Sequence, residues 1–157
     1  MSQCKRAFVR PGDIEDPGRY EFVVSACLVG LPCRYDGYSH FCPQVYSLWE
    51  EGKACAVCPE GLAGLPIPRL PCELVEGDVI SRDGEDLSYL FRQGVARALA
   101  ITRAVGARKA IVKSRSPSCG LGEIYDGTFS RTLCHGNGLW TEALLAEVLS
   151  VVTEEKL

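Results

Sequence analysis

The stretch Phe22-Val-Val-Ser-Ala-Cys-Leu-Val-Gly30 decides the fold of this chain. It is a short run rich in β-branched residues, and Gly30-Leu-Pro32 closes it, so it predicts a buried strand that leads into a loop. Two later runs, residues 54–57 and 108–114, have the same apolar character and predict two more buried strands.

Segments with helical periodicity alternate with these strands. Residues 43–52 have apolar side chains at helical spacing, and residues 86–105 form the longest amphipathic stretch. A last helix is expected over residues 141–151, capped by Thr141. By contrast, the prolines and glycines of residues 61–71 predict an irregular surface loop.

An alternation of strands and helices is typical of an α/β protein with a mainly parallel sheet. The length of 157 residues fits one domain. We therefore expect a single three-layer Rossmann-like domain over residues 21–157, preceded by an N-terminal extension of residues 1–20. In such folds the ligand site lies at the carboxyl ends of the strands.

Composition excludes several classes of protein. The chain is 46% hydrophobic with a net charge of −3, which excludes a disordered chain and argues against nucleic acid as a partner. No run approaches the roughly 20 apolar residues of a transmembrane helix, and acidic residues near the start argue against a signal peptide. We expect a cytoplasmic protein with no membrane contact. There, its nine cysteines would be reduced and available as metal ligands or catalytic groups.

Three cysteines stand out by position. Cys27, Cys58 and Cys119 each lie at or just after the end of one predicted strand, next to glycine or proline residues that shape the turn. Because the carboxyl ends of parallel strands meet at one edge of a sheet, these thiols should converge on one site. The alternative is that cysteine is simply a small hydrophobic residue that suits buried strands.

Three thiolates from separate strand ends differ from a structural zinc site, which has four ligands and paired C-x₂₋₄-C spacing. An all-thiolate set suits an iron–sulfur cluster, and three ligands would leave one iron open to bind substrate as a Lewis acid. Two alternatives stay open: a non-catalytic module in which a cluster or zinc only braces the loops, and a thiol redox protein that uses Cys55 and Cys58. The redox alternative is weak, because residues three apart in a strand face opposite sides and the sequence after Pro59 predicts no helix.

Polar side chains occupy the same turns as these cysteines. Glu60 follows the second cysteine by two residues and suits general acid/base work, and Ser116 precedes the third by three and could orient a substrate or water. Their ordinary roles would be a helix-capping carboxylate and a turn serine. Arg34, Arg69 and Arg115 are weaker candidates for binding the oxygen atoms of a substrate.

The remaining cysteines are treated as incidental. Cys33, Cys42, Cys72 and Cys134 fall in predicted loops or a hairpin strand. Cys33 is the strongest candidate among them for a further site residue, because only five residues separate it from Cys27.

Several motifs together resemble the thiouracil desulfurase (TudS-like) family, long catalogued as a domain of unknown function. They cover residues 23–145 in the family's order. The most specific are Ser25-Ala-Cys-Leu-Val-Gly30, Arg34-Tyr-Asp-Gly37, Cys58-Pro-Glu60, Lys113-Ser-Arg-Ser-Pro-Ser-Cys-Gly120 and Gly122-Glu-Ile-Tyr-Asp-Gly-Thr-Phe129.

The resemblance implies a [4Fe-4S] cluster with three cysteine ligands and one open iron, which takes the sulfur of a thiolated pyrimidine. Carried over by motif, the ligands are Cys27, Cys58 and Cys119, and the catalytic residues are Glu60 and Ser116. The implied reaction replaces sulfur by oxygen, as in 2-thiouracil to uracil, and releases hydrosulfide without net redox change in the substrate.

This chain also departs from the family pattern. Trp140 stands where smaller residues are usual, so the substrate is in question more than the chemistry. Longer relatives carry an extra domain and act on thiolated transfer RNA. This chain shows neither that domain nor a basic charge balance, so we expect its substrate to be a free base or nucleoside. A homodimer and a protein that accepts the sulfide are further expectations.

Overall fold

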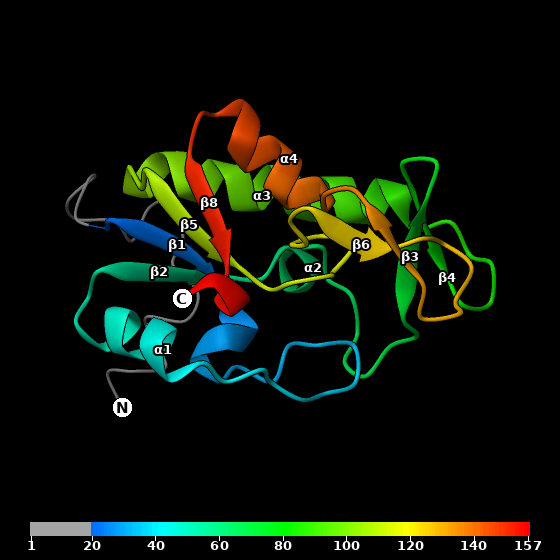
Figure 1. Ribbon diagram of the computed structural model, residues 1–157, viewed down its shortest axis with the longest axis horizontal. Coiled ribbons are helices and arrows are strands. Elements are labelled where there is room, and N and C mark those ends of the chain that lie inside the picture. The colour runs from blue at the N-terminus through cyan, green and yellow to red at the C-terminus, as the bar shows by residue number, and fades with distance from the viewer. Residues whose placement is uncertain (1–19) are drawn as a thin grey trace.

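Four parallel strands form the central sheet in the order β2-β1-β5-β8. The computed structural model describes residues 20–157, so residues 1–19 of the predicted extension lie outside the described part. The strands are β1 (Phe22–Ser25), β2 (Ala54–Val57), β5 (Lys109–Val112) and β8 (Ser150–Thr153). Their carboxyl ends lie at one edge of the sheet (Figure 1). The predicted α/β fold with a mainly parallel sheet is confirmed.

Helices cover both faces of the sheet and complete three layers (Figure 1). They are, on one face, α3 (Ser88–Val105) and α4 (Leu139–Ala146), and on the other, α1 (Pro43–Glu50) and the 3-10 helix η3 (Ala26–Val29). Consecutive residues of β1 supply the two cores, because Val23 packs with the first set and Val24 with the second. The sheet is thus buried on both sides, as parallel sheets usually are.

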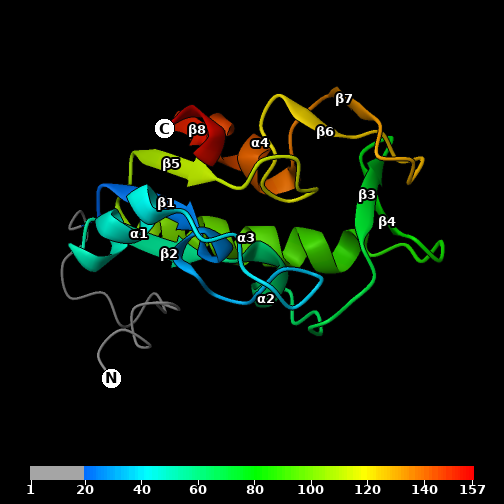
Figure 2. The same ribbon diagram turned by 60° about the horizontal axis from the view of Figure 1, so that its bottom comes forward.

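Two hairpins lie beyond the carboxyl ends of the strands (Figures 1 and 2). They are β3 (Cys72–Val75) with β4 (Asp78–Ser81), and β6 (Glu123–Tyr125) with β7 (Leu133–His135). Glu73 joins them, because its buried carboxylate accepts hydrogen bonds from the backbone N–H groups of Gly127 (3.0 Å) and Phe129 (3.1 Å). The hairpins form an outer wall around the region into which the strands point.

The sequence prediction was wrong at the C-terminal end. α4 ends at Ala146, and the second half of the helix predicted over residues 141–151 gives way to the fourth strand, β8, and a short 3-10 helix, η4 (Glu154–Lys156). Ser150-Val-Val-Thr153 is β-branched and pairs with β5, and this pairing overrides the helical periodicity. Thr141 does not cap the helix, because its hydroxyl donates to the Cys119 carbonyl oxygen (2.7 Å).

A helix also follows the second strand, where none was predicted. α2 (Pro59–Leu62) is a single turn that begins at Pro59, whose missing N–H needs no partner at that position. The Cys58 sulfur accepts a hydrogen bond from the Gly61 N–H (3.3 Å) and caps the turn. Residues 64–71 then form the irregular loop expected from their prolines.

A glycine in α3 lets α2 pack closely against it. An ideal Cβ at Gly94 would lie 2.1 Å from the Pro59 carbonyl oxygen and 2.9 Å from the Ala63 Cβ. We therefore expect Gly94→Ala to displace α2 and to lower the free energy of unfolding by about 1–3 kcal/mol, measured by urea denaturation. Helix propensity alone would make the alanine variant more stable, so an unchanged or higher stability would contradict this close packing.

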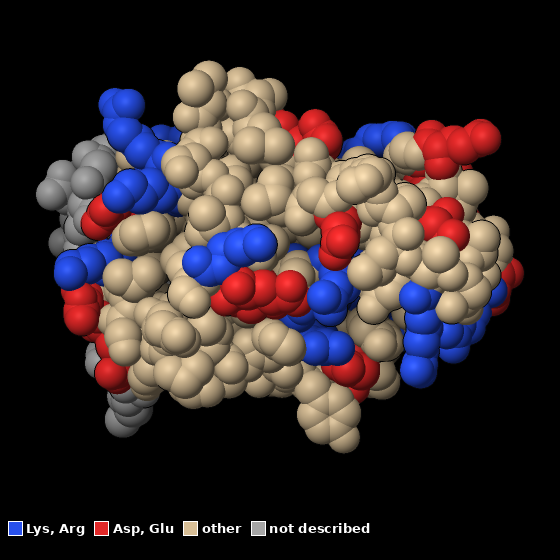
Figure 3. Space-filling model, in the orientation of Figure 1, with Lys and Arg blue, Asp and Glu red and all other residues tan. Residues whose placement is uncertain are grey.

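No helix within residues 20–157 is long and apolar enough to cross a membrane. On the face drawn in Figure 3, Lys and Arg side chains near the centre lie next to Asp and Glu, and neither sign forms a broad patch. This face therefore has mixed charge.

Candidate active site

The carboxyl ends of the sheet strands open into a pocket of about 420 Å³. Its walls come from η3 and the loop after it, the start of α2, the β3–β4 hairpin and the loop before it, the loop after β5, and the β6–β7 hairpin. All eight predicted site residues line it: Cys27, Arg34, Cys58, Glu60, Arg69, Arg115, Ser116 and Cys119. The fold thus brings together side chains that are far apart in the sequence.

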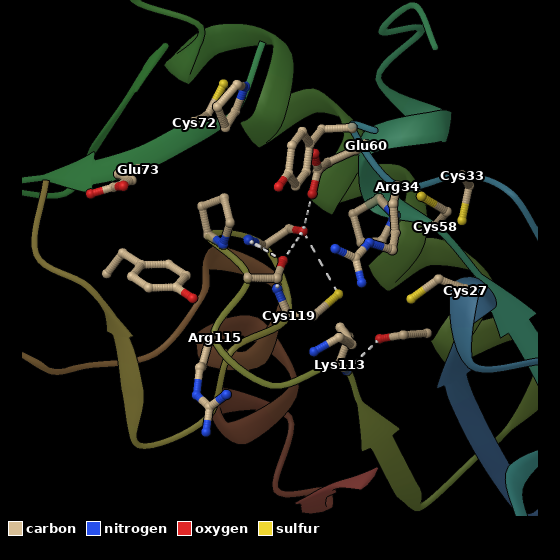
Figure 4. Close-up of a pocket in the computed structure, with 18 of the residues that line it drawn as sticks. Cys27, Cys33, Arg34, Cys58, Glu60, Cys72, Glu73, Lys113, Arg115 and Cys119 are labelled. Atoms are coloured by element: carbon tan, nitrogen blue, oxygen red, sulfur yellow. Dashed lines mark hydrogen bonds between the residues drawn. The ribbon is translucent and has the colours of Figure 1, made fainter. Parts of the chain in front are cut away.

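Each candidate cysteine is placed by the turn that follows its strand. Cys27 lies in η3 directly after β1, Cys58 follows β2 and caps α2, and Cys119 lies in the loop after β5. Their side chains gather on one side of the pocket (Figure 4). The convergence expected from three strand ends is present in the structure.

A fourth thiol, Cys33, lies beside them (Figure 4). Hydrogen bonding to Cys27, together with burial, raises the pKa of the Cys33 thiol to about 12, and Cys33 also contacts Cys58. The only sequence signal that Cys33 belongs to the site was its short distance from Cys27 along the chain. Such spacing does not show in which direction a side chain points. Cys72 also lines the pocket but lies away from the group (Figure 4).

Two of the candidate ligand thiols, Cys58 and Cys119, are hard to ionise. Burial raises the pKa of Cys119 to about 12, and hydrogen bonding to Cys33 together with burial raises the pKa of Cys58 well above its ordinary value. Within residues 20–157, no group of three or more His, Cys, Asp or Glu side chains is arranged to hold a metal ion. The donor chemistry nevertheless fits an iron–sulfur cluster, because soft thiolates are its usual ligands and its iron would offset their charge.

Glu60 stands on the first turn of α2 with both carboxylate oxygens engaged. Its Oε1 accepts from Arg69 Nε (3.2 Å) and Nη2 (2.9 Å), and its Oε2 accepts from the Ser118 hydroxyl (2.7 Å). The Arg69 side chain is 7% exposed and the Glu60 side chain 16%. The arginine therefore fixes one oxygen and leaves the other directed at the serines.

The loop that carries Ser116 is built around the hydroxyl of that residue. Ser116 Oγ accepts from the backbone N–H groups of Ser118 (3.1 Å) and Cys119 (3.0 Å), which shapes the turn before the third cysteine. The Ser116 and Ser118 hydroxyl oxygens are 2.9 Å apart. Ser118 was not predicted as a site residue. The only sequence signal was its position two residues after Ser116, which does not by itself show that the two hydroxyl groups meet.

A family model described as 2-thiouracil desulfurase matches residues 22–156. The chain belongs to the 2-thiouracil desulfurase family. The YbbK protein of Bacillus subtilis (strain 168), which is uncharacterized, is 38% identical over 146 residues, covering 86% of this chain and 96% of its own. A solved structure described as the [4Fe-4S]-dependent thiouracil desulfidase TudS is 40% identical, with a TM-score of 0.83 over 88% of this chain and 93% of that chain. The resemblance drawn from the motifs is confirmed.

The C-x-x-C pair of this desulfurase family member is split between the two sides of the sheet. Cys55 packs in the core beneath α3, whereas Cys58 packs with η3 and α1 on the other side, as strand alternation predicted. Burial raises the pKa of the Cys55 thiol to about 12, so its thiolate is disfavoured. A thioredoxin-like dithiol is therefore not formed by these two residues, although a helix does follow Cys58.

We expect Cys55→Ala to retain the activity of the parent protein, because the Cys55 sulfur does not reach the pocket. The measurement is sulfide release from 2-thiouracil by the two proteins at equal iron content. Loss of activity in a folded, iron-loaded Cys55→Ala protein would favour the thiol redox alternative.

Cationic side chains line more of the pocket than the sequence indicated. Arg34 pairs with Asp36 (3.1 Å), as a turn-stabilising pair would, and Arg115 pairs with Glu155 (3.2 Å). The lining cations that were not singled out from the sequence are Arg82, Lys113 and Arg131. Together they favour an electron-rich ligand.

The Glu60–Arg69 pair should also stabilise the fold. Replacing Arg69 by methionine leaves a largely buried carboxylate without its cation, and we expect the free energy of unfolding to fall by about 2–4 kcal/mol. Urea denaturation of the metal-free protein measures this. The double variant Arg69→Met, Glu60→Gln should recover part of the loss, whereas equal stability of Arg69→Met and the parent would show that solvent replaces the arginine.

Proposed function

We propose that this protein is an iron–sulfur-cluster-dependent desulfurase. It removes sulfur from a thiolated pyrimidine or similar small heterocycle, as in 2-thiouracil to uracil, and releases hydrosulfide. The observation that carries the proposal is the pocket in which the three family-motif cysteines lie beside Glu60 and the two serines. Family membership and the 40% identical desulfidase structure support it.

In this proposal Cys27, Cys58 and Cys119 hold a [4Fe-4S] cluster. When bound, the cluster supplies one iron without a protein ligand, which acts as a Lewis acid and accepts sulfur. Glu60 and Ser116 line the same pocket as these three cysteines, and the thiolated carbon of the substrate would lie beside them.

Glu60 is the proposed general base, because its Oε2 is the carboxylate oxygen that Arg69 does not hold. It takes a proton from the water whose oxygen attacks the thiolated carbon. Ser116 positions the substrate, and Arg34, Arg69 and Arg115 contribute positive charge around it. The carbon–oxygen bond forms, and the carbon–sulfur bond breaks with its electron pair on sulfur. Glu60 returns its proton so that the sulfur leaves as hydrosulfide, and the second water proton passes to solvent as the carbonyl forms.

A pocket of about 420 Å³ suits a small heterocycle better than a folded nucleic acid. We also propose a cytoplasmic location, because a reducing compartment keeps the pocket thiols free to bind iron.

Anaerobic reconstitution with iron and sulfide, followed by incubation with 2-thiouracil, tests the function. We expect iron uptake, uracil formation and release of an equal amount of hydrosulfide. Iron uptake without desulfuration of thiolated pyrimidines would support the alternative, a non-catalytic module in which the cluster only braces the loops. Failure of the folded protein to bind iron would overturn the cluster mechanism.

A further inference from the structure

One buried carboxylate fastens the outer wall of the pocket. Glu73 on β3 is 9% exposed, and a single one of its oxygens, Oε1, accepts both hydrogen bonds from the loop between β6 and β7. The two donors, the backbone N–H groups of Gly127 and Phe129, lie 54 and 56 positions from Glu73 in the sequence. This side chain therefore ties a loop of one hairpin to a strand of the other.

The same loop lies directly against the backbone of β3. An ideal Cβ at Gly127 would lie 2.8 Å from Val75 Cγ2 and 2.9 Å from the Leu74 carbonyl oxygen, and the φ of Gly127 is 90°. Glycine suits both the close approach and the left-handed backbone. The contact keeps the Gly127 N–H within reach of the Glu73 carboxylate.

Two other residues of the loop have backbone conformations that favour glycine. The φ of Phe129 is 56° and the φ of Arg131 is 59°. Residues with side chains keep such conformations only where the surrounding contacts hold them. The hydrogen bond from the Phe129 N–H to Glu73 is one of these contacts, so we expect the loop to change conformation when the carboxylate is removed.

The loop brings side chains to the pocket. Tyr125, Phe129 and Arg131 line it from the β6–β7 hairpin, and Arg82 lines it from the residue after β4. The Arg82 guanidinium lies 5.9 Å from the centre of the Phe129 ring, a cation–π contact between the two hairpins. Tyr125 and Phe129 offer aromatic surface, which suits a planar heterocycle.

We propose that Glu73 is a positioning residue for substrate binding, because it holds the β6–β7 loop in place as the wall that the heterocyclic ring contacts. The proposal rests on the desulfurase function above. Glu73 lies on the side of the pocket away from Cys27 and Cys58 (Figure 4). Its removal should therefore weaken substrate binding and leave both the iron content and the turnover of bound substrate unchanged.

Two measurements on the metal-free protein test the wall itself. Hydrogen exchange of the Gly127 and Phe129 amides should be about tenfold faster in Glu73→Ala, because their shared acceptor is lost. Trypsin cleavage after Arg131 should also become faster, and mass analysis of the peptides identifies that site. Glu73→Gln keeps an oxygen acceptor and should stay close to the parent in both measurements. Equal exchange rates in Glu73→Ala and the parent would overturn the proposal.

Steady-state kinetics of the iron-loaded protein test the consequence for the substrate. For sulfide release from 2-thiouracil, we expect Glu73→Ala to raise KM about tenfold, with kcat and iron content within about twofold of the parent. This split means that binding common to the bound substrate and the transition state was lost. A general structural defect would lower kcat or iron content instead. Glu73→Gln should restore most of the parent KM.

Gly127→Ala displaces the same loop without altering the carboxylate. It should raise KM as well, and the double variant with Glu73→Ala should be little worse than either single variant, because both release one wall. Glu85→Ala, which removes an exposed carboxylate shortly after β4, is the matched control and should leave KM and the two exchange rates unchanged.

Faster exchange with an unchanged KM would overturn the proposal, since the wall would then not contact the substrate. A lower kcat at constant KM would overturn it too. If the iron-loaded parent releases no sulfide, the proposed function fails, and the dissociation constant of 2-thiouracil, measured by titration calorimetry, takes the place of KM. A larger constant in Glu73→Ala would then support the wall, whereas equal constants or no binding would overturn it.

Discussion

Serine in place of Cys27, Cys58 or Cys119 will abolish both iron uptake and sulfide release. The three side chains gather on one side of the pocket from three separate segments of the chain, and we expect the cluster to need a thiolate from each of them (Figure 4). A serine hydroxyl is nearly the same size as the thiol, but it is a harder and far less acidic ligand that iron–sulfur clusters do not favour. Iron and acid-labile sulfide analysis after anaerobic reconstitution measures the first effect, and hydrosulfide release from 2-thiouracil measures the second.

Two further cysteines make this a sharp test. Cys33→Ser alters a thiol in contact with Cys27 and Cys58, and Cys55→Ala removes a thiol on the far side of β2. We expect both variants to retain iron. Retention of a full cluster by Cys119→Ser would contradict the proposed ligand set. Loss of iron from Cys33→Ser, with retention in Cys27→Ser, would make Cys33, in the loop after η3, the ligand in place of Cys27.

The part of the site that lies at strand ends could be predicted from the sequence. Short apolar runs fix where β1 and β2 end, and parallel pairing then brings Cys27 and Cys58 to the same edge whatever the strand order. Glu60 follows because it is two residues from Cys58. These predictions needed only local patterns and one rule about parallel sheets.

The rest depends on side-chain directions and on pairings between distant residues. Cys33 meets Cys58 only because the loop after η3 folds back, and no local pattern specifies that path. Ser118 reaches Glu60 across 58 positions of sequence. β8 was missed for a similar reason, since Ser150–Thr153 is too short to be recognised as a strand until β5 offers it a partner.

Glu60→Gln should produce a protein that binds its cluster and hardly turns over. The amide keeps the size of the side chain, and its oxygen can still accept from Arg69. Its nitrogen would face Ser118 as a donor, so the position of Oε2 can no longer accept a proton. We expect kcat to fall by about 10²–10⁴, the usual contribution of a general base, with iron content unchanged. Glu51→Gln, at an exposed ion pair with Lys53, is the matched control.

The result separates the catalytic function from the bracing function. If the cluster only held the loops together, Glu60→Gln would affect stability alone, and sulfide release would follow iron content in every variant. If Glu60 is the base, Ser118→Ala acts on the same group, because the Ser118 hydroxyl donates to Glu60 Oε2. The double variant should then be little slower than Glu60→Gln by itself, because both substitutions affect one carboxylate. Additive losses would mean that carboxylate and hydroxyl act at separate steps.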